Sequence, residues 1–150
     1  MKMFDAKSPV YTLVVWNDFL FSGDYDGTIK QWNHEGVCVK TFNAGSEVYS
    51  FVVWNDSLFS GDRNGKIKQW NPEGVCVKTF DAKSPVYTLV VWNDSLVSGD
   101  SSGTIKQWVD EEWEARQGQR QQDIRNLLLV YLRSTPELNE DCAKEIATYF

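Results

Sequence analysis

The sequence repeats itself three times with a period of 38 residues, and this repetition limits the possible folds more than any other feature. Residues 4–32 and 80–108 differ at four of 29 aligned positions, and residues 4–41 and 42–79 differ at ten of 38. Units this similar must share one backbone structure. Catalysis needs unlike residues that converge on one point, whereas copies of one unit supply sets of like residues. The repeats therefore favour a scaffold over an enzyme.

Each unit predicts four short strands and no helix. In the first unit, residues 10–16 form a β-branched and aromatic run, and Asn17-Asp18 is a break typical of a hairpin. A second strand is expected at residues 19–22, a third at 28–32, where apolar and polar residues alternate, and a fourth at 37–42. Four strands in about 40 residues are typical of one blade of a β-propeller.

The stretch LFSGDYDGTIKQWN at residues 20–33 resembles the core of a WD-repeat blade, and it recurs three times within residues 1–109. The resemblance implies an all-β fold of three four-stranded antiparallel blades, at about residues 5–42, 43–80 and 81–109. The Trp-Asp pair of the family is Trp32-Asn33 here, and Ala6-Lys7 stands where the family has Gly-His. The buried His-centred network of the family therefore cannot form, and we expect aromatic packing between blades to carry more of the stability.

Three blades do not make a ring, because a propeller needs roughly four to eight. An arc of three would leave apolar flanks exposed at both ends. Residues 1–4 align with the outer strand at 39–42, whereas no outer strand follows the third unit. Because the resemblance implies that the N-terminal strand completes the last blade of a closed ring, we expect a second chain to donate it.

The sequence thus predicts a head-to-tail homodimer that forms one six-bladed ring by strand exchange, half of the ring coming from each chain. The expected seam residues are Met1, Lys2, Met3, Phe4, Ile105, Gln107 and Trp108. A fragment of a longer propeller and a larger ring remain as alternatives.

The composition changes at residue 110, and residues 110–150 predict a short α-helical hairpin. Apolar residues lie on one face of a first helix, and Ser134-Thr135-Pro136 ends it and starts a second. The residues expected to make the contacts of this tail are Ile124, Leu127, Leu128, Tyr131, Leu132, Leu138, Ile146 and Tyr149. Residues 138–150 are also similar to the opening of an F-box, which implies a substrate adaptor of a ubiquitin ligase as an alternative function.

Charge and motifs exclude several classes of partner. The net charge of −6 argues against binding of nucleic acid or of an anionic membrane surface, and the longest apolar run, residues 127–132, is too short to span a bilayer. The start of the chain does not resemble a signal peptide, so a cytoplasmic location is expected. Three cysteines without metal-ligand spacing predict no cofactor; Cys38 and Cys76 are expected to be at least half-buried thiols, and the only histidine, His34, to lie in a surface turn.

The resemblance also implies where partners bind. WD-repeat propellers present the loop that leads into each blade, and the loop between its second and third strands, on one face. The candidate binding residues on that face are Lys7, Tyr25, Glu47, Arg63, Lys83 and Ser101. Several of them differ between otherwise identical units, as specificity residues on a fixed frame would; drift on a solvent face is the alternative. The sequence therefore predicts a non-catalytic scaffold for protein or peptide partners, with an amplified or engineered assembly without a ligand as the alternative.

Overall fold

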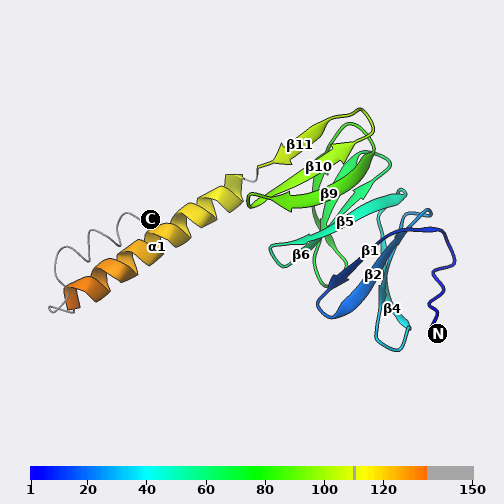
Figure 1. Cartoon of the computed structure of the whole chain (residues 1–150), viewed down its shortest axis with the longest axis horizontal. Coiled ribbons are helices and arrows are strands. Elements are labelled where there is room, and N and C mark those ends of the chain that lie inside the picture. The colour runs from blue at the N-terminus through cyan, green and yellow to red at the C-terminus, as the bar shows by residue number, and fades with distance from the viewer. Residues whose placement is uncertain (110, 135–150) are drawn as a thin grey trace. The chain divides into compact units, whose positions relative to one another are not determined.

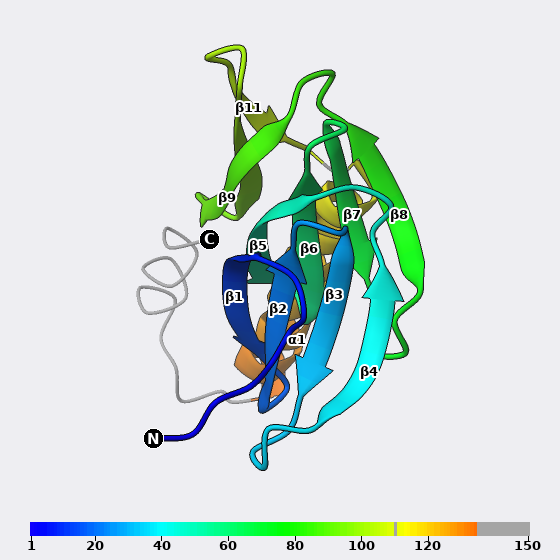
Figure 2. The same ribbon diagram turned by 90° about the vertical axis from the view of Figure 1, so that its right-hand side faces the viewer.

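The structure is a computed structural model of the chain, and it describes residues 1–109 and 111–134. The chain divides into two compact units, Met1–Trp108 and Val109–Phe150. The first unit consists of three antiparallel sheets, which stand side by side as blades (Figures 1 and 2). The predicted fold, three propeller blades followed by a helical segment, is confirmed.

Two of the blades have four strands and the third has three. The first blade contains β1 (Val10–Trp16), β2 (Phe19–Asp24), β3 (Thr28–Trp32) and β4 (Cys38–Asn43). The second contains β5 (Val48–Trp54), β6 (Ser57–Asp62), β7 (Lys66–Trp70) and β8 (Cys76–Asp81). The third contains β9 (Val86–Trp92), β10 (Ser95–Asp100) and β11 (Ile105–Trp108). Within each sheet every strand pairs with the next strand along the chain.

Local sequence explains the turns between these strands. Asn17 and Asp18 adopt φ angles of 50° and 65°, as the two central residues of a tight hairpin turn require. The second strand extends two residues beyond the predicted end, to Asp24, whose carboxylate accepts hydrogen bonds from the backbone amides of Asp26 and Thr28. The turn from β2 to β3 is therefore closed by a side chain of the preceding strand.

The hydrophobic cores lie between neighbouring blades. Phe21 and Ile29 of the first blade pack with Val48 and Leu58 of the second in one buried cluster. A Cβ atom on Gly23 would lie 2.5 Å from Cγ1 of Val48, so the two blades approach too closely there for any larger residue. A second cluster joins the second and third blades in the same way. The second blade therefore packs one face against the first blade and the other against the third.

A lysine-centred network occupies each blade, and the sequence analysis did not foresee it. Lys30 Nζ donates a hydrogen bond to the carbonyl oxygen of Ala6 and lies 3.4 Å from Oδ2 of the buried Asp24. In the third blade Lys106 Nζ donates to the Ala82 carbonyl and lies 3.0 Å from Asp100 Oδ2. These contacts tie the segment that leads into each blade to its third strand. Polar contacts therefore add to the aromatic packing between blades, which we expected to carry more of the stability of the fold.

The expectation that Cys38 and Cys76 are at least half buried is wrong. Both are free thiols and both are exposed, because they begin β4 and β8, the outermost strands, of which most residues face solvent. Their Sγ atoms lie 3.7 and 3.4 Å from the hydroxyl oxygens of Thr41 and Thr79.

The second unit contains α1 (Glu111–Ser134), which ends at the predicted stop signal but begins well before the predicted apolar stripe. Ile124 and Leu127 are exposed, and Leu128 is half-buried. The predicted second helix, with Leu138, Ile146 and Tyr149, and the F-box-like stretch lie outside the described residues. In the part of the chain that the structure describes, no helix is long and apolar enough to cross a membrane.

Candidate functional site: two open flanks

Identical residues at the open end of the arc and inside it differ sharply in exposure. Ile29 and Ile67 are 0% exposed, whereas their counterpart Ile105 is 79% exposed. The three isoleucines occupy the same position in the third strand of their blades. Ile105 differs because, among the residues that the structure describes, no fourth strand pairs with β11 and no blade packs on this face.

The same contrast defines the rear flank, the face of the third blade that points away from the second. It consists of Val90, Trp92 and Ile105, all exposed. Trp92 is 65% exposed, whereas its counterpart in the first blade, Trp16, is 3% exposed and lies in the first core cluster. An indole of that size in solvent leaves a large apolar area without a partner.

The front flank is the corresponding open face of the first blade. It consists of Phe4, Val10, Leu13, Val15, Leu20 and Trp32. Val10 is 44% exposed, whereas its counterparts Val48 and Val86 are 0% exposed. Leu13 is likewise exposed, and the equivalent Phe51 and Leu89 are buried. The chain therefore carries two halves of a blade-to-blade interface, one at each end.

The N-terminal residues lie against the first blade (Figure 2). The Phe4 ring stacks on Trp32 with centroids 5.8 Å apart, as Phe42 packs on Trp70 at 5.7 Å. Lys2 Nζ donates a hydrogen bond to the His34 carbonyl oxygen. In the same way Lys40 Nζ donates to the carbonyl oxygen of Pro72, the counterpart of His34, at 3.1 Å. Phe4 and Lys2 thus make against the first blade the contacts that Phe42 and Lys40 of the outer strand β4 make against the second.

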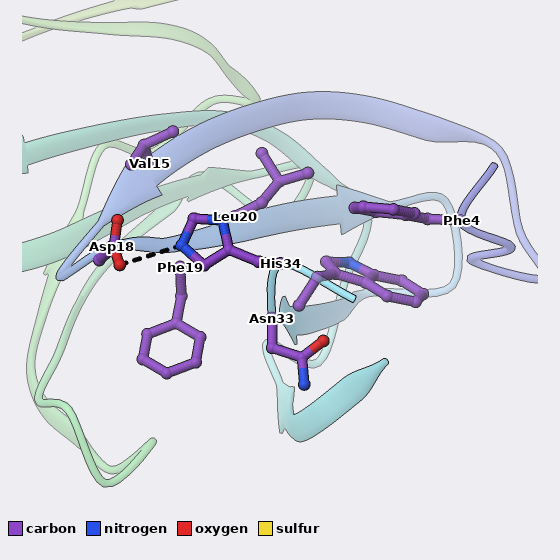
Figure 3. Close-up of a pocket in the computed structure, with 8 residues that line it drawn as sticks. Phe4, Val15, Asp18, Phe19, Leu20, Asn33 and His34 are labelled. Carbon is purple, nitrogen blue, oxygen red and sulfur yellow. Dashed lines mark hydrogen bonds and ion pairs between the residues drawn. The ribbon is translucent and has the colours of Figure 1, made fainter. Parts of the chain in front are cut away.

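Two hollows mark the front flank. One, of about 240 Å³, lies between Phe4, Val15, Leu20 and the His34 turn (Figure 3). At its rim His34 Nε2 lies 3.0 Å from Asp18 Oδ2, and this hydrogen bond raises the pKa of His34. The other, of about 230 Å³, is lined by Phe4, Ala6, Val10, Leu13, Leu20, Ser22 and Trp32. Six of these seven residues have counterparts 38 residues later in the first core cluster: Phe42 of β4, Ala44 of the following segment, and Val48, Phe51, Leu58 and Trp70 of the second blade.

The predicted binding residues lie on loops that the structure brings together within each blade. The amides of Tyr25, Arg63 and Ser101 donate to the carbonyls of Pro9, Glu47 and Pro85, respectively. Arg63 Nη1 also lies 2.6 Å from Glu47 Oε1, and this hydrogen bond lowers the pKa of Glu47.

The remaining predicted face residues also make local contacts. The hydroxyl oxygens of Ser84 and Ser101 lie 3.0 Å apart, while Lys7 and Lys83 pair with Asp5 and Asp81 at 2.5 and 2.8 Å. The face thus consists of separate pairs, one set per blade, rather than one cluster. Among residues 1–109 and 111–134, no three His, Cys, Asp or Glu side chains are placed to hold a metal ion.

Sequence reasoning missed a row of tyrosines on the innermost strands. The rings of Tyr11, Tyr49 and Tyr87 meet edge to face with centroids 5.4 Å apart at each step, and Tyr25 meets Tyr11 at 6.3 Å. It also missed Trp92, Val90 and Leu13 as flank residues. The 38-residue period signals that equivalent residues face the same way in every unit, but it does not state which face of a strand meets the next blade.

The family model "WD domain, G-beta repeat" matches residues 2–33 and 74–109. The chain therefore carries WD repeats in these two stretches, and its blades have the β-propeller fold. No curated protein matches the WD-repeat chain in sequence.

Solved propellers match the WD-repeat chain in structure. The designed proteins Ika4 and Ika8 are 28% and 27% identical to it, each with a TM-score of 0.59; the matches cover 66% and 67% of this chain, and 64% and 33% of theirs. The WD40 propeller domain of Doa1 is 21% identical, with a TM-score of 0.62 over 68% of this chain and 37% of that one. The WD-repeat chain therefore matches less than two thirds of each of these chains.

Proposed function

We propose that the chain is a non-catalytic protein-interaction scaffold and that two copies close into one ring of six blades. The WD40 repeats and the propeller neighbours support the scaffold role. The observation that carries the ring is the exposure of Ile105 beside the complete burial of Ile29 and Ile67. The three residues are equivalent in sequence and strand position, and, in the part of the chain that the structure describes, Ile105 differs from the other two in having no neighbouring blade over it.

The two open flanks complement each other because each is a copy of a surface that already fits its counterpart inside the chain. The rear flank corresponds to the face that the first blade turns to the second, and the front flank to the face that the second blade turns to the first. A contact between unlike surfaces is heterologous, so it must either close a ring or propagate. Two chains supply six blades, within the range of known propellers, whereas three would supply nine.

Light scattering after size-exclusion chromatography tests the ring. The expected mass is that of two 17.2-kDa chains, unchanged on dilution through the micromolar range. A mass of one chain would contradict self-association, and a mass of three chains would contradict the six-bladed ring.

The binding face is proposed to lie on the loops that carry Tyr25, Arg63 and Ser101, each of which occurs twice in the ring. Selection of peptides from a random library against the assembled protein tests this assignment. Bound peptides should lose affinity on Arg63→Ala and keep it on Lys40→Ala, which changes an exposed side chain of an outer strand. Equal binding to both variants, or no selected peptide at all, would overturn it.

A further inference from the structure

The arrangement of the blades also assigns the contacts at the seam. We propose that residues 2–5 of a second copy form the missing fourth strand on β11, with Phe4 of the partner subunit opposite Ile105, and that Trp92 fills a hollow on the partner. This inference rests on the proposed ring and adds its register.

The register follows from the two complete blades. β3 pairs with β4 so that Ile29 lies opposite Phe42 and Gln31 opposite Lys40. β7 pairs with β8 in the same register, with Ile67 opposite Phe80. The period of 38 residues carries these pairs onto Ile105 with Phe4, Lys106 with Met3, and Gln107 with Lys2. Phe4 already has the ring position that this strand needs, because its centroid lies 5.8 Å from that of Trp32, as the Phe42 centroid lies 5.7 Å from that of Trp70.

A backbone hydrogen bond between neighbouring blades supports the same arrangement at the seam. The amides of Ala44 and Ala82 donate to the carbonyls of Gly27 and Gly65, at 2.8 and 2.7 Å. A Cβ on either glycine would lie 2.8 Å from the backbone nitrogen of Ser46 or Ser84. Gly103 occupies the equivalent turn and has nothing within 4 Å of that position, so its space is open for the segment that leads into the partner's first blade.

The hollow on the front flank completes the contact. Trp16 belongs to the same core cluster as Phe42, Leu58 and Trp70. The counterparts of these three residues on the front flank are Phe4, Leu20 and Trp32, and all three line both hollows. Trp92 is the counterpart of Trp16, and it is 65% exposed where Trp16 is 3% exposed. By this correspondence the Trp92 indole would lie against Phe4, Leu20 and Trp32 of the partner subunit.

Disulfide trapping tests the register. In a background with Cys38, Cys76 and Cys142 changed to Ser, Phe4→Cys combined with Ile105→Cys places the two thiols on directly opposite residues, a spacing that disulfide geometry accepts. We expect oxidation to give a covalent two-chain species on non-reducing electrophoresis. Mixing a chain that carries only Phe4→Cys with a tagged chain that carries only Ile105→Cys should give a disulfide between the two.

The matched control is Phe4→Cys with Lys106→Cys, which shifts the register by one residue and turns the second thiol to the other face of the strand. Equal trapping of this pair, or a disulfide only within one chain, would overturn the register. A two-chain mass by light scattering without trapping of either pair would overturn the register and leave the ring standing. A one-chain mass of the cysteine-free background and of the native chain would overturn both.

A second variant needs no disulfide. Trp92→Ala should raise the dissociation constant of the dimer by at least roughly a thousand-fold, because each of the two seams loses an indole. The thermal unfolding of the diluted single chain should stay unchanged, since Trp92 is already mostly exposed there. An unchanged dissociation constant would show that Trp92 does not fill the hollow.

Discussion

Replacing Ile105 by Ala separates the stability of the seam from the stability of the fold. The side chain is 79% exposed in one chain, and its counterparts inside the arc are 0% exposed, so assembly is expected to bury nearly all of it. The substitution removes three carbon atoms, at about 0.8 kcal/mol each, or about 2 kcal/mol per seam. A closed ring of two chains has two seams, so the free energy of dimerisation should fall by about 4 to 5 kcal/mol. The dissociation constant should therefore rise roughly a thousand-fold.

The assay is a concentration series followed by light scattering or analytical ultracentrifugation, beside chemical unfolding of the diluted chain. Ile105→Ala should shift the dissociation constant and leave unfolding of the single chain within about 0.5 kcal/mol, as expected for an exposed site. The control is Ile29→Ala, which removes the same atoms from a buried position and should destabilise the fold by about 2 to 5 kcal/mol. If Ile105→Ala leaves the dissociation constant unchanged, the reasoning that equates exposed flanks with seams is refuted.

Three further predictions follow from contacts within the blades. Ser60→Ala leaves the buried Trp70 Nε1 without its acceptor at 2.9 Å, and should cost about 1 to 3 kcal/mol in urea unfolding; Ser98→Ala should cost less because Trp108 is only part-buried. The hydrogen bond from the Ser102 hydroxyl, and to a lesser extent the one from Lys106, holds the pKa of Asp100 well below its ordinary value. The resulting stabilisation is present above the pKa that Asp100 has in the unfolded chain, and it is lost as the pH falls toward the folded value. Ser102→Ala should therefore destabilise the chain at pH 7, by an amount that shrinks at acid pH if unfolding is followed across the range. Asp18→Asn should lower the pKa of His34, which the Asp18 hydrogen bond raises, and an NMR titration of the imidazole that shows no change would contradict that contact.

The strands were predictable because the same strand pattern occurs in all three units. The run at residues 10–16, the Asn17-Asp18 turn and the alternation at 28–32 reappear as β1, the tight turn and β3 with the expected bounds. The second strand ran longer than predicted because Asp24, a residue typical of turns, continues the ladder while its side chain closes the turn. Local propensity cannot separate these two roles of an aspartate.

The contacts between blades were harder to predict. The alternation at residues 28–32 marks Lys30 only as polar, whereas its ammonium group meets Asp24 and the Ala6 carbonyl, which lies 24 residues earlier in the sequence. Cys38 and Cys76 were misplaced for the opposite reason, since cysteine is usually buried and only the outermost place of β4 and β8 exposes them. Trp92 was predictable in kind but not in place, because the period does not state which face of a strand meets the next blade.

The joint proposed between chains uses the same surfaces as the joints within a chain, and this has a consequence for how such a ring is counted. The angle between neighbouring blades, rather than the length of the polypeptide, would then fix the circumference. A shortened chain with only two of these units should therefore assemble from three copies instead of two, and six units in tandem should close alone, all reaching the same circle by different divisions.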